Sequence, residues 1–446
     1  MIKKTTHIGL DDTDSTRRGC TTYVAALLVE KLEELGAEFI DYPSLIRLNP
    51  NVPWKTRGNG ALCLRVRYRA SLESGIEEAV ISAVERHADM EFEGTDPGIV
   101  FFKRSQIPKQ IRNFSKDAIT SVVSLKDAVH LLARFKAEAV GFKNDRGIIG
   151  ALAAVGEILQ GDHTYEILAY RVPQNCGLKR KVDEASIFRM DEATAPYTFN
   201  NIDADKRRVI ITPRGPDPIL FGIRGESPEV VKRAFGMVKP LEPVERWVIF
   251  RSNQGTDAHL KRVMKLGQIM PYSPVVVRGV VSSNPRIVPR RHVIFSISDD
   301  SAQVDCAAYE PTGVLRQAAR ELIVGDHVEV CGGVRPASSN RPLTINLEKI
   351  RVLRLAPKNI YHNPLCSKCG KRLKSMGKNQ GFRCEKCGSK YQNLEKMVIP
   401  VERNIRRGLY ITATRSQRHL TKPFSRYGLE KRRGTIKELI DGWHFP

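Results

Sequence analysis

Short apolar runs alternate with amphipathic segments over the first 135 residues. The pattern is typical of an α/β unit, because side chains repeat every two residues in a strand and every 3.6 in a helix. Residues 43–60 are rich in proline and asparagine and are expected to form a loop. Two short helices, at 116–123 and 125–135, are expected to join this unit to the next. The other predicted elements are strands near 6–10, 38–42, 61–68 and 99–102, and helices near 23–35 and 75–87.

A second α/β pattern covers residues 141–251. Its order, βαββαβ, favours a ferredoxin-like sandwich. Gly150 lies in its first helix, where small residues suit tight packing on a sheet slightly better than the approach of a ligand. Asp217 and Glu226 are the acids in this unit that would suit a cationic substrate. The predicted elements are a strand end running into a helix over 147–159, strands at 164–171, 208–212, 219–223 and 247–251, a helix at 227–238, and a long polar connection before 208.

Residues 270–355 change to a pattern of strands. Five strands with a helix between the third and fourth are the layout of an OB-fold, which commonly binds single-stranded nucleic acid. The predicted strands are 275–282, 292–298, 304–309, 327–334 and 343–353, with the helix at 314–322. Arginines would give the barrel a positive face: Arg278, Arg286, Arg290, Arg291, Arg335 and Arg341.

Charge supports a nucleic-acid partner. The net charge is +23, and the last 91 residues hold 21 Lys and Arg against 6 Asp and Glu. Such a concentration of positive charge favours phosphate polymers, although a basic surface can also serve solubility. No apolar run reaches the roughly 18 residues that span a bilayer, and the N-terminus does not resemble a signal peptide. We therefore expect a cytoplasmic protein without a membrane partner.

Four of the nine cysteines form two pairs near the C-terminus. Cys366 and Cys369 are separated by two residues, as are Cys384 and Cys387. Four thiolates at this spacing predict a closed tetrahedral Zn²⁺ site with a structural role, rather than a disulfide or redox role. The basic hairpin between the pairs carries Phe382, which would suit stacking on a base. The basic residues after 396 are expected to be either an arm that orders on RNA or a disordered tail.

An acidic loop follows the first predicted strand. Asp11, Asp12 and Asp14 would repel one another unless a cation lies among them, and Mg²⁺ shared with substrate phosphates is the usual reason for such a cluster. The next helix would direct its free N–H groups to the same place, with Thr21 or Thr22 as its N-cap. An acidic turn that merely caps the helix is the alternative, but a cap needs only one carboxylate.

A basic, glycine-rich turn adds a second candidate for nucleotide binding. Lys55, Arg57 and Gly58 combine flexible backbone with two cations, which can wrap a triphosphate, although a plain hairpin turn has the same composition. Cys20 lies beside the acidic loop and is expected to pack rather than to act as a nucleophile. The candidates for nucleotide binding are thus Asp11, Asp12, Asp14, Thr22, Lys55, Arg57 and Gly58.

Several stretches, in this order, resemble the archaeal tRNA agmatinylcytidine synthetase family. They are GLDDTDSTRRGCTTY, LIRLNPNVPWKTRGNG, RGIIGALAAVGEIL, LFGIRGES and the paired cysteines. The resemblance extends to about Pro423, and the basic stretch after Gly428 has no match. It implies a multidomain α+β protein. The implied domains are an ATP-binding kinase-like α/β domain at 1–135, a ferredoxin-like domain at 136–255 as the candidate agmatine site, an OB-fold barrel at 268–356 and a zinc ribbon at 360–395. The resemblance does not explain the basic C-terminal tail that we expect at 396–446.

The resemblance also implies an activity. An ATP-dependent ligase of this family conjugates agmatine to the wobble cytidine of an isoleucine tRNA with a CAU anticodon. The product, 2-agmatinylcytidine, lets the tRNA read AUA. ATP would phosphorylate the carbonyl at position two of the base, and the agmatine amine would displace that phosphate. By position in the motif, the implied catalytic residues are Asp11, Asp12 and Asp14, which would hold Mg-ATP, and Thr21, which matches a threonine that becomes phosphorylated.

Two other functions remain open from the residues alone. A non-catalytic RNA-binding protein would explain the OB-fold and zinc ribbon, but not the acidic loop. A kinase for a small molecule would explain the N-terminal half, but not the basic C-terminal end.

Overall fold

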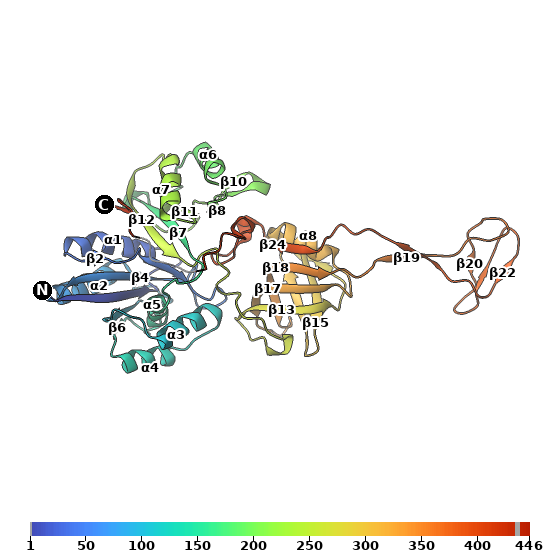
Figure 1. The fold of residues 1–446 in the computed structure, drawn as a ribbon, viewed down its shortest axis with the longest axis horizontal. Helices are drawn as coiled ribbons and strands as arrows, with labels where there is room; N and C mark the ends of the chain where they lie inside the picture. The colour runs from blue at the N-terminus through green and yellow to red at the C-terminus, as the bar shows by residue number, and fades with distance from the viewer. Residues whose placement is uncertain (1, 433–437) are drawn as a thin grey trace.

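The structure is a computed structural model that describes residues 2–432 and 438–446. Figure 1 shows a broad sheet with helices on both faces, a β-barrel beside it, and a long arm that ends in a small ribbon. None of the helices within the described ranges is long and apolar enough to cross a bilayer.

One sheet of eleven strands underlies both predicted α/β units. Only the contact between β3 (Ser44–Arg47) and β12 (Val244–Ser252) is parallel, and it joins the two units edge to edge. The strand Ser44–Arg47 forms this junction, so the prediction of a loop over 43–60 is wrong at its start. The order across the sheet is β6 (Glu138–Gly141), β5 (Gly98–Phe102), β1 (Lys3–Asp11), β4 (Gly60–Arg69), β3 (Ser44–Arg47), β12 (Val244–Ser252), β7 (Thr164–Arg171), β11 (Ile219–Gly225) and β8 (Thr198–Phe199), with β2 (Glu38–Phe39) on β4 and β25 (His444–Phe445) on β12.

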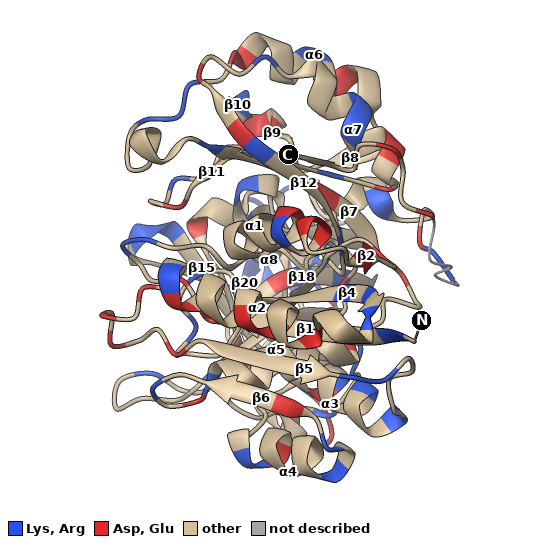
Figure 2. Ribbon diagram, turned by 90° about the vertical axis from the view of Figure 1, so that its left-hand side faces the viewer, with Lys and Arg blue, Asp and Glu red and all other residues tan. Residues whose placement is uncertain are grey.

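Alternate residues of the first half face two separate cores. Leu62 and Leu64 of β4 join one core, while Ala61 and Cys63 join the other, as the two-residue period of a strand requires. Figure 2 shows α3 and α4 at one end of the sheet and α6 and α7 at the other. The helices are α1 (Thr21–Glu34), α2 (Glu73–His87), α3 (Lys109–Thr120), α4 (Leu125–Phe135), α5 (Gly147–Gly156), α6 (Glu184–Thr194) and α7 (Pro228–Met237).

Helix α5 belongs to the first half of the sheet. It packs on β1, β4 and β5, and α3 and α4 cover it from outside. The short helices therefore cover α5 and do not simply join two units, as the sequence analysis expected. Gly150 meets the Asp11 carboxylate so closely that a Cβ would lie 1.8 Å from Asp11 Oδ2. The tight packing expected for Gly150 is confirmed.

The second half has the predicted ferredoxin-like order, but other segments fill it. Strands β12, β7, β11 and β8 lie side by side, with α6 and α7 as the two helices. Helix α6 lies within the segment that was expected to be a polar connection. The predicted strand at 208–212 is instead part of a separate hairpin of β9 (Ile202–Asp203) and β10 (Arg208–Val209).

The next domain is the predicted OB-fold. Its strands close into a barrel through the β13–β15 pairing, and every predicted strand and the helix are present. The elements are β13 (Pro274–Val281), β14 (Arg286–Val288), β15 (His292–Ser298), β16 (Gln303–Ala308), α8 (Val314–Glu321), β17 (His327–Arg335) and β18 (Thr344–Arg354).

The arm of Figure 1 carries the cysteines. A two-stranded stalk leads to a three-stranded ribbon whose small core includes Cys366, Leu373 and Phe382. Phe382 is buried, so the expectation that it stacks on a base is wrong. The strands are β19 (Asn359–His362) and β23 (Met397–Pro400) in the stalk, and β20 (Lys374–Ser375), β21 (Phe382–Arg383) and β22 (Lys390–Tyr391) in the ribbon.

The chain then returns to the main body. Residues 408–431, which we call the C-terminal strap, begin with β24 (Gly408–Ile411) on the barrel strand β18 and continue to the large sheet. Arg426 of the strap is fully buried, and Trp443 packs near Phe39 and Tyr42. The described part of the C-terminal region is thus folded onto the body, unlike the expectation of a disordered tail.

Candidate active site

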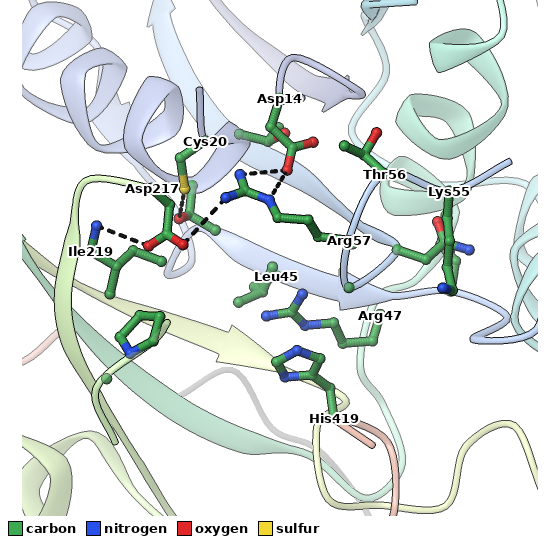
Figure 3. A pocket seen from close by; sticks show the side chains of 18 of the residues that line it. Asp14, Cys20, Leu45, Arg47, Lys55, Thr56, Arg57, Asp217, Ile219 and His419 are labelled. Atoms are coloured by element: carbon green, nitrogen blue, oxygen red, sulfur yellow. Dashed lines mark hydrogen bonds and ion pairs between the residues drawn. The ribbon is translucent and has the colours of Figure 1, made fainter. Parts of the chain in front are cut away.

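A cavity of about 900 Å³ lies over the junction of the two half-sheets. Its walls come from the acidic loop, the loop before β4, the start of α5, strands β3, β7 and β11, and the C-terminal strap. Figure 3 shows side chains from these separate segments pointing toward one space. The structure brings together the candidates for nucleotide binding and the candidate catalytic residue Thr21. The nucleotide-binding candidates are Asp11, Asp12, Asp14, Thr22, Lys55, Arg57 and Gly58.

The ionised forms of the aspartates in the acidic loop are electrostatically unfavourable in this structure. Burial raises the pKa of Asp11 well above its usual range, and repulsion from Asp12 and Asp14 adds to this. Burial also raises the pKa of Asp12, even though Arg146 lies 2.9 Å away. A cation close to Asp11 would relieve this cost, because an opposite charge favours the ionised carboxylate.

Two threonines begin helix α1 beside these carboxylates. Thr21 is its first residue, and its hydroxyl accepts a hydrogen bond from the Thr13 hydroxyl at 3.1 Å. The N-cap is Cys20, without a side-chain cap, so neither Thr21 nor Thr22 has the predicted capping role. Burial raises the pKa of the Cys20 thiol to about 11, which agrees with a packing role rather than with a nucleophile.

Arg57 connects the basic turn to both half-sheets. Its guanidinium lies 2.6 Å from Asp14 and 3.2 Å from Asp217, and it donates to the Gly19 carbonyl at 2.7 Å. Asp217 also pairs with Arg180 at 3.1 Å. Of the two acids considered for a cationic substrate, Asp217 lines the cavity, whereas Glu226 lies elsewhere and pairs with the strap.

Sequence reasoning missed several side chains that line the cavity. Arg146 bridges Asp12 and Asp96, and Arg224 lies 2.9 Å from Glu166. Arg47 and His419 complete the wall beside Gly58. The quoted motifs include Arg47 and Arg146, but no local spacing marks them as site residues. His419 comes from the opposite end of the chain and has no such signal at all.

The cysteines gather as predicted. The Sγ atoms of Cys366, Cys369, Cys384 and Cys387 all lie within 4.8 Å of one another. Four thiolates arranged this closely fit a tetrahedral Zn²⁺ with no open position, hence a structural site. Within the described residues they are the only such group of three or more metal ligands; the aspartates do not converge to this degree.

Models of the TiaS family match most of the chain. The TiaS TCKD domain matches residues 7–144, the TiaS FLD domain 145–259, and the TiaS C-terminal zinc ribbon domain 363–405. A model of the OB-fold nucleic acid binding domain matches residues 275–353.

Relatives and solved structures agree with these matches. A tRNA(Ile2) 2-agmatinylcytidine synthetase TiaS from Methanocaldococcus jannaschii is 41% identical over 93% of this chain and 97% of its own length. The same enzyme from Pyrococcus horikoshii is 42% identical over 94% of this chain and 96% of its own. The structure of a TiaS-tRNA(Ile2)-ATP complex is 39% identical, covers 95% of this chain and 97% of its own, and has a TM-score of 0.86.

A TiaS-tRNA(Ile2)-AMPCPP-agmatine complex is similar over 97% of this chain and the whole of its own, with 35% identity and a TM-score of 0.84. Domain order, sequence identity and fold therefore agree over nearly the full length of the chain. This chain belongs to the TiaS family.

Proposed function

We propose that this protein is an ATP-dependent ligase that joins agmatine to the wobble cytidine of an isoleucine tRNA with a CAU anticodon. One observation carries the proposal: the acidic loop, Thr21 and the basic turn line a single cavity at the junction of the two half-sheets. Membership of the TiaS family supplies the substrates, since relatives have been solved with tRNA(Ile2), ATP and agmatine. A tRNA substrate also favours a cytoplasmic location.

The acidic loop is the proposed site of Mg-ATP. Mg²⁺ usually keeps several waters and takes only one or two carboxylates together with substrate phosphates, so three aspartates that do not converge still suit it. When bound, Mg²⁺ would neutralise charge on the phosphates during transfer. Asp11 and Asp12 are the proposed ligands, with Asp14 holding Arg57 toward the same space.

The chemistry needs a poor leaving group to be activated. ATP donates a phosphoryl group to O2 of cytidine: a P–O bond of the triphosphate breaks as the P–O2 bond forms, the rest of the nucleotide leaves, and the carbonyl oxygen becomes part of a phosphate ester. The primary amine of agmatine then attacks C2, the C2–O2 bond breaks, and phosphate leaves with O2. The amine proton passes to solvent or to a carboxylate of the cavity. By its motif position, Thr21 is the proposed residue that becomes phosphorylated.

Agmatine is proposed to enter on the ferredoxin-like side. Glu166 and Asp217 are carboxylates that line this half of the cavity, and agmatine is a dication. The division into residues 1–135 for ATP and 136–255 for agmatine therefore remains our proposal. The OB-fold, the ribbon at 360–395 and the basic C-terminal region would bind the rest of the tRNA, since their charge suits a phosphate polymer.

The test is a nucleoside mass measurement. The protein is incubated with ATP, Mg²⁺, agmatine and archaeal tRNA. The tRNA is then digested, and the masses of its nucleosides are measured by mass spectrometry. We expect a cytidine heavier by agmatine minus water, formed only with ATP. Asp11→Asn should abolish this product while tRNA remains bound, because it removes a metal ligand far from the barrel. Retained binding with no product from the wild-type protein would instead identify a non-catalytic RNA-binding protein.

A further inference from the structure

Most of the partly buried arginines around the cavity are already paired with carboxylates. Arg57 pairs with Asp14, Arg146 with Asp12, and Arg224 with Glu166. Arg47 of β3 differs, because its guanidinium has no acceptor among the described residues. Its Nε is buried without a hydrogen-bond partner, and burial lowers the pKa of Arg47 to about 10. Arg47 is partly buried, and a partly buried cation without an acceptor carries a desolvation cost, so a ligand that supplies an acceptor would be favoured.

His419 of the C-terminal strap supplies a second donor beside Arg47. His419 Nδ1 lies 2.9 Å from Arg224 Nη2, which can only donate, and 3.1 Å from Gln254 Oε1, which can only accept, so these two contacts favour opposite tautomers of the ring. Burial, with Arg47 and Arg224 adding to it, lowers the pKa of His419 well below its usual range, so the ring is neutral. No hydrogen bond joins His419 Nε2 to a residue that the structure describes, and in the tautomer that protonates this nitrogen it can donate to a ligand.

Both donors face the backbone of Gly58. A Cβ on this residue would lie 2.8 Å from Arg47 Nη1 and 3.0 Å from His419 Nε2. The missing side chain of Gly58 therefore lets the turn pack tightly against these two side chains, with no space for a further carbon atom at this point. Figure 3 shows the Arg47 guanidinium and the His419 ring lying close together, below Leu45 and apart from the aspartates.

We propose that Arg47 and His419 form a seat for a phosphate group of a substrate, opposite the acidic loop. Phosphate oxygens accept charge-assisted hydrogen bonds and would satisfy both donors at once. Agmatine, a cation, would be repelled from this place. The phosphate belongs either to ATP or to the tRNA backbone next to the wobble cytidine. We name these two sources because they are the phosphate-containing substrates of the proposed function.

The seat also gives the C-terminal strap a role in binding. His419 is held between Arg224 and Gln254, and its neighbours in the strap bind the body: Gln417 to Asn200 at 3.0 Å, and Thr421 to Glu348 at 2.9 Å. The seat is therefore complete only when the strap is docked.

Two variants test the seat in the full-length protein. Arg47→Gln removes the charge, and Gly58→Ala keeps both side chains but displaces them, because the added Cβ would lie 2.8 Å from Arg47 Nη1 and 3.0 Å from His419 Nε2. Arg86→Gln is the control, because it removes an arginine from the exposed end of α2, away from the cavity. For each variant, the equilibrium binding of ATP is measured without tRNA, and tRNA binding is measured over a series of salt concentrations.

The results separate the two sources of phosphate. If ATP supplies it, both variants weaken ATP binding by about 10- to 100-fold, as expected for hydrogen bonds to a charged group, and leave tRNA binding unchanged. If the RNA backbone supplies it, ATP binding is unchanged, tRNA binding weakens, and the slope of log K against log salt falls in magnitude by about 0.7. ATP and tRNA binding that both stay within twofold of the wild-type values would overturn the proposal.

Thermal unfolding distinguishes a binding role from a structural one. Because Arg47 is unpaired, Arg47→Gln should leave the melting temperature unchanged or raise it. A clear decrease would mean that Arg47 supports the fold, and the proposal would fail. These measurements do not depend on product formation. An inactive wild-type protein would refute the proposed ligase activity, whereas an intact wild-type affinity lost in both variants would still support the seat.

Discussion

Replacing Arg426 by methionine tests whether the C-terminal strap is an integral part of the folded body. The Arg426 side chain is fully buried between two carboxylates. Its Nη2 lies 2.8 Å from Asp162 Oδ1, its Nε donates to Glu226, and its Nη1 donates to the Gly255 carbonyl at 2.5 Å. Methionine fills part of the volume but leaves Asp162 and Glu226 without their main partner.

The expected cost follows from these contacts. Removing one partner of a buried ion pair costs about 3 to 5 kcal/mol, because the other charge stays buried. Lys431 remains 2.8 Å from Glu226, and Lys422 remains 3.7 Å from Asp162. We therefore expect a value near the lower end, about 3 kcal/mol, which is about a 100-fold increase in the opening of the strap.

Hydrogen exchange of the strap amides measures this opening directly, because locally opened segments exchange before the whole protein unfolds. Arg407→Met is the matched control, since Arg407 is exposed in the same region, and its effect should stay within about 0.5 kcal/mol. If Arg426→Met changes strap exchange by less than the equivalent of about 1 kcal/mol, these ion pairs do not hold the strap, and our reasoning fails.

Three further changes give distinct outcomes. The pKa of Glu348 is lowered to about 2, because His259 and Arg418 outweigh the effect of burial. Glu348→Gln should therefore cost about 3 kcal/mol in urea unfolding at pH 7, and the difference should shrink below pH 4.5 and vanish near pH 2. Cys384→Ser should remove bound zinc, measured by metal analysis, and expose the ribbon to proteases while ATP binding persists, because the ribbon core is separate from the body. Gly150→Ala should displace Asp11 and lower the unfolding free energy by about 1 to 3 kcal/mol, with ATP turnover lost as well; unchanged turnover would contradict the role of Asp11.

Patterns that repeat within a short window were predictable from the sequence. Apolar and polar residues alternate along the OB-fold strands. The spacing of the paired cysteines is by itself enough to predict a zinc site. Strand β3 was missed because it has only four residues, lies next to a proline, and is set by its parallel partner β12. Helix α6 was missed because Glu184–Thr194 is polar on average and is buried along only part of its surface.

The candidate site was predictable only where it lies in one loop or one turn. The aspartates, Thr21 and Arg57 occur in compact motifs, and the structure places them around one cavity. Arg47 and His419 are 372 positions apart in the sequence. They lie close together only because the C-terminal strap, which follows the zinc ribbon, packs back against the main body. The strap looked like a tail because its contacts are ion pairs with distant partners, and those leave no periodic pattern.

The strap makes the OB-fold and the cavity parts of one structure. Thr421 donates to Glu348 of β18, while His419, two residues earlier, faces Gly58 in the cavity. Arg418, just before His419, donates to Asn51, at the start of the loop that carries the basic turn. A shift of β18 would therefore move residues on both sides of the cavity. The strap would transmit this movement directly, so no chain of contacts through the hydrophobic core is needed. Truncation before residue 414 should for this reason weaken the binding of the cavity's phosphate ligand, and not only the affinity for the distant parts of the tRNA.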